Sequence, residues 1–163
     1  MERGLLKGLG NGRFGPESPM TRAMVVTVLH RMVGTPKPTV SQPFTDVESG
    51  QWYTDAIAWA YEAGVAKGIS ATHFGKDDYI TREQLVTMLY RFAILTGVSS
   101  SGRNPLTDFK DTEDISDYAR EAFEWAVAMD IIAGSKGMLT PTKTATRAQC
   151  AKIMVLFSDF LTY

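Results

Sequence analysis

The chain has 163 residues, of which 44% are apolar, and a formal net charge of −1. This composition excludes an intrinsically disordered chain, and the near-neutral charge excludes a global field that would recruit nucleic acid. The single cysteine, Cys150, excludes an intramolecular disulfide, and no run approaches the roughly 20 apolar residues that span a bilayer. The first residues lack the apolar segment of a secretory signal. Any anion must therefore be bound by a local arrangement of Arg and Lys.

A Thr-Arg pair followed by a mostly apolar run occurs three times along the chain. The pairs are Thr21-Arg22, Thr81-Arg82 and Thr146-Arg147. An offset of 60 residues aligns the first two copies, and an offset of 66, falling to 65 at the Thr-Arg pair, aligns the third copy with the second. A period this long indicates a supersecondary unit that is repeated a few times.

The copies are expected to form one domain over the whole chain, 1–163. A partial first repeat and two complete repeats follow one another at 1–35, 44–97 and 109–163. Connectors rich in Pro, or in Ser and Gly, separate them. The first repeat lacks its front half, because the counterpart of Phe44 would lie before Met1.

Each complete repeat has the pattern helix, loop, helix. In the second repeat these elements are expected at 56–63, 65–80 and 82–95. The first helix is followed by Gly64 and the second by Gly97, and Gly is the residue most favoured just after a helix. Because no stretch has the pattern of a long strand, the chain is predicted to be all-α.

The Thr of each pair is predicted to cap the helix that follows it. The capping residues are Thr21, Thr81 and Thr146, with Gln84 and Gln149 completing a capping box in the last two copies. Met24 cannot complete the box in the first copy. Capping does not explain the Arg, because a cation in the first helical turn costs about 0.3–1 kcal/mol at the positive end of the helix dipole. The same unfavourable choice at three positions indicates that the Arg has a function.

These residues resemble the S-layer homology (SLH) domain, whose repeats carry a Phe-x-Asp segment, a Trp, a helix ending near Gly, a Gly-containing loop and a Thr-Arg-Ala-Glu motif. The resemblance covers almost the whole chain in about two and two-thirds repeats. It implies an all-α, pseudo-threefold domain of three tandem helix-loop-helix repeats around a central helical bundle. It also implies noncovalent anchoring of an exported protein to the bacterial cell wall, through grooves between repeats that bind secondary cell-wall polymer carrying pyruvylated sugars.

Carried over position by position, the resemblance implies a set of glycan-binding residues. They are Arg22, Arg82, Arg147, Asp46, Asp111, Trp52, Tyr118, Gly68 and Gly134. The Glu of the family motif is replaced by Met24, Gln84 and Gln149, and the first repeat lacks its Asp and its Trp. A groove that needs the front half of the first repeat is therefore expected to be incomplete.

The chemistry of this set suits an acidic sugar. A pyruvate ketal presents a carboxylate, which Arg can bind through two charge-assisted hydrogen bonds worth about 1.5–3 kcal/mol each in a sheltered site. The N–H groups at the start of the capped helix are expected to favour the same anion, the aromatic residue to stack on a sugar, and the loop Gly to let the backbone approach the ligand. Lys7 and Lys67 precede the loop Gly and are expected to be secondary anion contacts, whereas the third copy has Ala133 there.

Structural alternatives stay open for these residues. Each motif Arg could instead form a salt bridge with the Asp of a neighbouring repeat, and Trp52 and Tyr118 could be core or helix-staple residues. Trp59 and Trp125, within the first helices, are expected to lie in the core. The two histidines, His30 and His73, do not recur in register, and the acidic loop clusters lack EF-hand spacing, so no metal and no cofactor are expected.

No paired carboxylates or Ser/His/Asp constellation stands out from the repeat pattern, so the chain is not expected to be an enzyme and no catalytic residue is assigned. The favoured function is a cell-wall anchor at the extracellular surface, with an acidic, pyruvylated polysaccharide as partner, and without nucleic acid or membrane insertion. The alternatives are a protein interaction or self-assembly module of a surface layer, through the first repeat, and the non-catalytic part of a polysaccharide-degrading enzyme.

Overall fold

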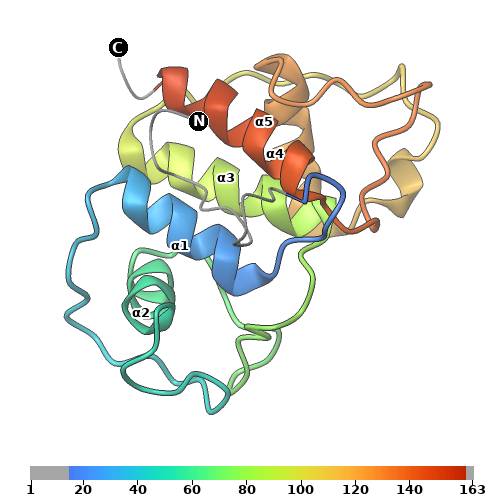
Figure 1. Cartoon of the computed structure of the whole chain (residues 1–163). Helices are drawn as coiled ribbons and strands as arrows, with labels where there is room; N and C mark the ends of the chain where they lie inside the picture. The colour runs from blue at the N-terminus through green and yellow to red at the C-terminus, as the bar shows by residue number, and fades with distance from the viewer. Residues whose placement is uncertain (1–14, 161–163) are drawn as a thin grey trace. The chain divides into compact units, whose positions relative to one another are not determined.

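The computed structural model describes residues 15–160, which form helices joined by long loops (Figure 1). The α-helices are α1 (Arg22–Met32), α2 (Thr54–Glu62), α3 (Arg82–Thr96), α4 (Asp117–Ala128) and α5 (Arg147–Phe160), with a 3₁₀ turn at Thr112–Asp114. Between residues 15 and 160 the only β-type pairs are isolated bridges. The predicted all-α class is confirmed, and every helix expected in this range is present.

The predicted helix caps at the first two Thr-Arg pairs are confirmed. Thr21 Oγ1 accepts a hydrogen bond from the N–H of Met24 at 3.3 Å. Thr81 Oγ1 accepts from the N–H of Gln84 at 3.3 Å, and Gln84 Oε1 accepts in return from the N–H of Thr81 at 3.1 Å, which completes the capping box. Helix α3 ends at Gly97, whose φ of 75° lies in the left-handed region that favours glycine. The capping box of the third copy stays a prediction.

One compact unit contains residues 15–80 together with 146–148, and in it α1 packs against α2. Trp59 of α2 is buried, as predicted, and its ring lies 5.1 Å from that of His30 of α1. Nε2 of His30 lies 2.8 Å from the carbonyl oxygen of Pro36, so this buried histidine joins α1 to the connector that follows it. No pattern in the sequence predicts that role, because the other copies have no His at the equivalent position.

A second compact unit contains residues 81–145 together with 149–160, and in it α3 packs against α4. Its core holds the fully buried rings of Phe92, Trp125 and Phe157, with Phe157 lying 5.5 Å from Phe92 and 6.2 Å from Trp125. Trp125 is therefore a core residue, as predicted. Its indole N–H donates to the carbonyl of Ser99 at 3.0 Å, which satisfies the one polar group of a buried ring.

The start of each capped helix makes the same backbone contact with a loop of another copy. The N–H of Arg22 donates to the carbonyl of Asp78 at 2.9 Å, and the N–H of Arg82 donates to the carbonyl of Lys143 at 2.9 Å. The N–H of Arg147 donates to the carbonyl of Ser18 at 2.8 Å. The first copy thus binds the loop of the second, the second that of the third, and the third that of the first. One contact repeated at three equivalent positions is what a threefold repeat predicts.

Candidate functional site

Two of the motif arginines, Arg22 and Arg82, hold loop backbone with their side chains. Arg22 is buried, and its guanidinium donates from Nε to the carbonyl of Phe74 at 2.9 Å and from Nη2 to that of Lys67 at 2.7 Å. Arg82 is half-buried and donates from Nε to the carbonyl of Leu139 at 2.8 Å. Phe74 and Leu139 are equivalent residues, so both arginines bind the loop of the following copy at the same place. The cation that is unfavourable for its own helix therefore stabilises a tertiary contact.

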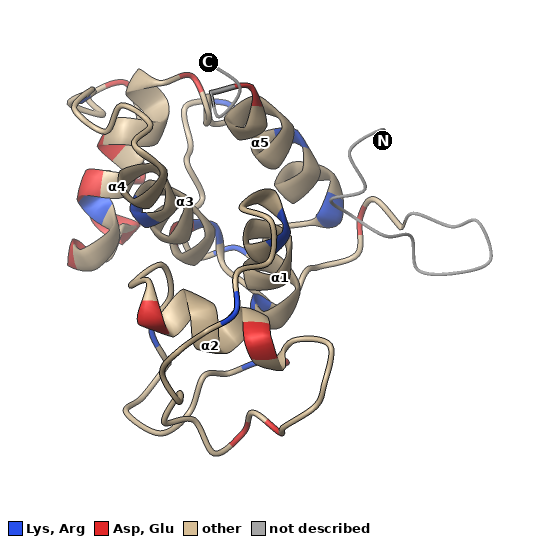
Figure 2. Cartoon of the chain, turned by 90° about the vertical axis from the view of Figure 1, so that its left-hand side faces the viewer, with Lys and Arg blue, Asp and Glu red and all other residues tan. Residues whose placement is uncertain are grey.

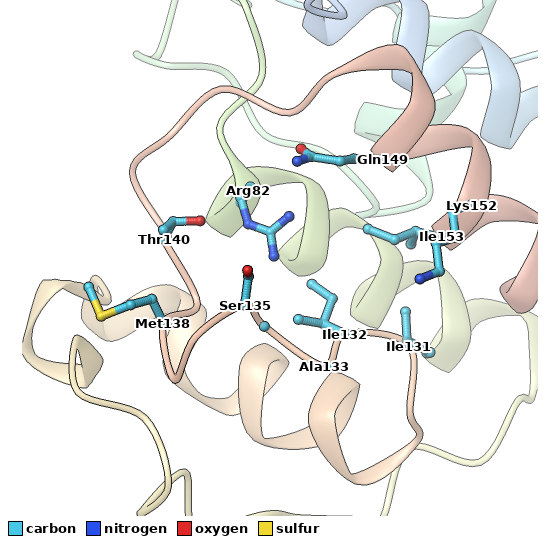
Figure 3. Close-up of a pocket in the computed structure, with 11 residues that line it drawn as sticks. Arg82, Ile131, Ile132, Ala133, Ser135, Met138, Thr140, Gln149, Lys152 and Ile153 are labelled. Atoms are coloured by element: carbon cyan, nitrogen blue, oxygen red, sulfur yellow. The ribbon is translucent and has the colours of Figure 1, made fainter. Parts of the chain in front are cut away.

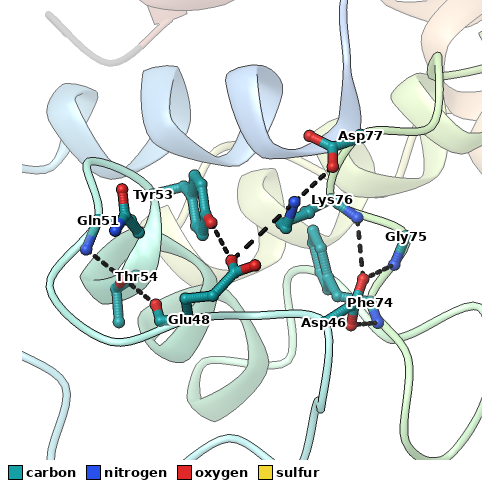
Figure 4. A network of polar contacts seen from close by, with 9 residues as sticks. All are labelled: Asp46, Glu48, Gln51, Tyr53, Thr54, Phe74, Gly75, Lys76 and Asp77. Carbon is teal, nitrogen blue, oxygen red and sulfur yellow. Dashed lines mark hydrogen bonds and ion pairs between the residues drawn. The ribbon is translucent and has the colours of Figure 1, made fainter.

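The Asp of each Phe-x-Asp segment binds the loop of its own copy through the loop N–H groups, as Figure 4 shows for Asp46. Asp46 accepts from the N–H groups of Phe74 at 2.8 Å, Gly75 at 2.8 Å and Lys76 at 3.2 Å. Asp111, which is buried, accepts from the N–H of Leu139 at 2.9 Å and that of Thr140 at 2.7 Å. Both predicted aspartates therefore order the loop backbone through charge-assisted hydrogen bonds.

Burial raises the pKa of the Asp46 carboxyl, but the N–H groups of Phe74, Lys76 and Gly75 outweigh that effect and hold the pKa below its ordinary value. In the part of the chain that the structure describes, Arg82 forms no ion pair with Asp111. The salt bridge considered for the motif Arg is thus absent at Arg82, because both side chains bind the backbone of Leu139 instead.

The helix N-terminus does not offer its N–H groups to a ligand, contrary to the expectation from the sequence. In α3 the N–H of Arg82 donates to the carbonyl of Lys143, and that of Glu83 donates to the carbonyl of Pro141 at 2.9 Å. The N–H of Gln84 donates to Oγ1 of Thr81. The equivalent groups at the start of α1 are used in the same way. An anion must therefore be bound by side chains.

A pocket of about 230 Å³ opens beside Arg82 in the second unit (Figure 3). Its lining comes from the start of α3, the loop before α5 and α5 itself, namely Arg82, Ile131, Ile132, Ala133, Gly134, Ser135, Met138, Thr140, Gln149, Lys152 and Ile153. Three buried isoleucines form its apolar part, and Ser135, Thr140 and Gln149 add polar groups. Its two charged residues are both cations, Arg82 and Lys152.

The guanidinium of Arg82 lies in the middle of the lining residues (Figure 3). Nε donates to the carbonyl of Leu139, whereas the two Nη atoms have no hydrogen-bond partner among residues 15–160. Burial lowers the pKa of this guanidinium, and Cys150 and Asp111 act in the opposite direction; an Arg stays charged at neutral pH. The pocket therefore presents a charged, partly desolvated donor pair.

Among the described residues, acidic and basic side chains occur on both the helices and the loops (Figure 2). No group of three or more His, Cys, Asp or Glu in the described residues is arranged to hold a metal ion. The helices described are all too short or too polar to cross a bilayer.

The predicted aromatic residues lie at the surface. Trp52 is 58% exposed and Tyr118 is 53% exposed, so the core alternative is wrong for both. The Trp52 ring packs edge-on against Tyr53, with 5.2 Å between the centroids. The hydroxyl of Tyr118 donates to Glu83 at 3.2 Å. Of the residues predicted to bind glycan, Arg82 and Gly134 line the pocket, and Gln149, predicted only as a cap, lines it too.

The loop glycines have a structural explanation. A Cβ on Gly68 would lie 2.5 Å from the ring of Phe44, and one on Gly134 would lie 2.7 Å from that of Phe109. Both Phe residues belong to the Phe-x-Asp segments. The ring that comes close to each glycine is therefore one of the protein's own, where the sequence had led us to expect a ligand. The neighbouring Lys67 has an exposed side chain, as an anion contact requires, while Lys7 lies outside the described residues.

Sequence reasoning missed Lys152 and Glu83. Glu83 is buried and accepts from the N–H and the hydroxyl of Ser116, each at 3.0 Å, as well as from Tyr118. It thereby fixes the segment before α4. An alignment of the copies would have singled out Lys152, because the other two copies have a threonine at its position, Thr27 and Thr87, and only the third has a lysine.

The fold and the pocket define an all-α tandem-repeat module with a cationic pocket. The chain belongs to the S-layer homology domain family, whose model matches residues 2–23, 43–99 and 108–151. This confirms the family that the sequence resembles.

Curated relatives include an amylopullulanase of Thermoanaerobacterium thermosulfurigenes, 32% identical over 93% of this chain and 8% of its own length. A surface-layer 125 kDa protein of Lysinibacillus sphaericus is 29% identical over 94% of this chain and 13% of its own length. A cellulosome-anchoring protein of Acetivibrio thermocellus is 29% identical over 79% of this chain and 29% of its own length. The chain thus spans under a third of each relative, and the shared segment occurs in surface-layer proteins, an anchoring protein and an enzyme alike.

Proposed function

We propose that this chain anchors the protein that carries it to the outside of a bacterial cell by binding an acidic cell-wall polysaccharide, and that it has no catalytic role. Relatives named as surface-layer and cellulosome-anchoring proteins support an anchoring role at the cell surface. The presence of the segment in enzymes such as an amylopullulanase supports an attached module that is separate from the catalysis.

The observation that carries the proposal is that the two Nη atoms of Arg82 have no hydrogen-bond partner among residues 15–160 and lie in a pocket whose lining residues include no carboxylate. A carboxylate on a sugar can accept two parallel hydrogen bonds from such a guanidinium. In this half-buried setting the pair is worth more than at a free surface, because less water competes with it.

The rest of the pocket suits a pyruvylated sugar. A pyruvate ketal carries a methyl group beside its carboxylate, and Ile131, Ile132 and Ile153 offer buried apolar surface for it. The hydroxyls of Ser135 and Thr140 and the amide of Gln149 can bind sugar hydroxyls. This is the typical composition of a ligand pocket, apolar with a few polar groups that fix orientation.

The first unit offers a second candidate contact in the exposed ring of Trp52. An indole face can cover the apolar face of a sugar ring. Arg22 and Asp46 support this unit by holding its loop, and Lys67 presents a charge beside the same loop. The glycan-binding roles of Arg147 and Tyr118 are likewise proposals.

The test is calorimetric titration of the chain with pyruvylated wall polymer, and with the same polymer after mild acid has removed the ketals. We expect binding that weakens with salt and with ketal removal, and a loss of at least tenfold in Arg82→Ala. Arg120→Ala is the matched control, because Arg120 is exposed and outside the pocket.

Arg82→Ala also removes the hydrogen bond from Nε to the carbonyl of Leu139, so a loss of affinity could come from a disturbed loop. Arg82→Lys is therefore measured in parallel. It keeps the charge but loses the two-pronged geometry, and we expect it to bind weakly while unfolding close to wild type. Equal affinity of the wild type and both variants would remove Arg82 from the site. Self-association of the chain without any affinity for the polymer would instead favour the surface-layer assembly alternative.

A further inference from the structure

Lys152 adds a second cation to the pocket that Arg82 lines. It lies in α5 with an exposed side chain, and it is drawn among the lining residues in Figure 3. Neither cation has an ion-pair partner in the described part of the chain, and no Asp or Glu lines the pocket. Like charges that share a pocket repel each other, so the arrangement is most favourable when anionic groups fill it.

The repeats differ in a way that points to the use of this lysine. The second copy has Lys67 before its loop Gly and Thr87 on its capped helix, whereas the third copy has Ala133 and Lys152 at the same two positions. Thr87 is buried, and its hydroxyl donates to the carbonyl of Glu83 at 2.7 Å, which is an ordinary arrangement inside a helix. At these two positions each copy therefore carries one lysine, on the loop in the second copy and on the helix in the third.

We propose that Lys152 binds a second anionic group of the glycan, next to the carboxylate that Arg82 binds. This inference rests on the proposed function and narrows the ligand of this pocket to a glycan segment with two neighbouring anionic groups. A carboxylate bound in fork geometry uses both of its oxygens on one guanidinium, which leaves the ammonium of Lys152 for a separate group. That group is a phosphate or a second carboxylate.

The test compares three synthetic methyl glycosides of one hexose. The first carries a single pyruvate ketal, the second carries the ketal and a phosphate on a neighbouring hydroxyl, and the third carries the ketal next to a carboxymethyl ether. We expect wild type to bind one of the dianionic probes about tenfold more tightly than the first probe. The comparison of the second and third probes distinguishes phosphate from carboxylate.

Lys152→Thr gives the third copy the residue of the second, and we expect it to lose this tenfold advantage, whereas its affinity for the single-ketal probe falls by a much smaller factor. Ala133→Lys combined with Lys152→Thr transplants the arrangement of the second copy and is expected to restore the advantage. Lys143→Thr, at an exposed position outside the pocket, is the matched control and is expected to leave all affinities unchanged.

The outcomes separate this inference from the proposed function. If Lys152→Thr binds every probe as wild type does, or weakens all of them equally, Lys152 does not bind a second anion. The proposed function then still stands, provided that Arg82→Ala loses affinity for every probe. If wild type binds no probe, or if Arg82→Ala binds as wild type does, the proposed function fails and this inference fails with it.

Discussion

Arg82 and Asp111 bind the same residue, Leu139, from its two sides. Nε of Arg82 donates to the carbonyl of Leu139 at 2.8 Å, and Asp111 accepts from its N–H at 2.9 Å. Arg22 and Asp46 bind Phe74 in the same way, at 2.9 and 2.8 Å. The Arg belongs to one copy, and the Asp belongs to the next copy, which also contains the loop. The recurring Arg and Asp thus hold the backbone of adjacent copies together.

Asp111→Ala is expected to destabilise the chain, because the buried N–H of Leu139 and that of Thr140 lose their acceptor. Leaving one buried donor unsatisfied costs about 1–3 kcal/mol, so the free energy of unfolding should fall by at least that amount. Urea unfolding measures it. Asp108→Ala, at an exposed neighbouring position, is the control. Equal stability of the two variants would contradict the role given to Asp111.

The contribution of Asp46 to stability should depend on pH. Its pKa in the folded chain lies below the ordinary value of 3.8, so the unfolded chain binds the proton more readily. The stabilisation is therefore fully present above the ordinary pKa and is lost as the pH falls through the lower, folded value. Urea unfolding between pH 7 and pH 2.5 should show a shallower loss of stability in Asp46→Asn than in wild type. Parallel curves for the two proteins would disprove this.

Gly134→Ala and Gly137→Ala form a matched pair. Both glycines have φ in the left-handed region, at 69° and 73°, so both variants pay the same backbone strain of about 1–2 kcal/mol. A Cβ on Gly134 also meets Phe109 at 2.7 Å, whereas the nearest atom to one on Gly137 lies at 3.7 Å. We expect Gly134→Ala to lose about 1–3 kcal/mol more than its partner in thermal unfolding. A smaller loss in Gly134→Ala would show that the Phe ring moves away freely.

Glu83→Ala is expected to loosen the segment before α4. Its carboxylate accepts three hydrogen bonds, two from Ser116 and one from Tyr118. Without them the amide of Ser116 should exchange its hydrogen faster by at least tenfold, while amides in the middle of α2, in the other unit, should be unaffected. Hydrogen exchange followed by NMR measures both. Unchanged protection of Ser116 would mean that the packing of α4 holds the segment without Glu83.

The sequence by itself determined the repeat, the helices and their caps, because these depend on residues close together in the chain. Thr81 and Gln84 lie one helical turn apart, so their capping box could be predicted without tertiary structure. The burial of Trp59 and Trp125 followed from their place on apolar helix faces. The recurring Arg could be singled out as a residue with a function.

Only the tertiary structure decided how that Arg is used. Arg82 reaches Leu139 across 57 positions of sequence, and no local pattern encodes such a contact. The same holds for the helix N–H groups, which the sequence left available to a ligand and the structure shows to be taken by loop carbonyls. The pocket is likewise formed by segments far apart in the chain, which bring Lys152 to Arg82. Side chains distant in sequence acquire a common function only when the packing of helices and loops places them at one site.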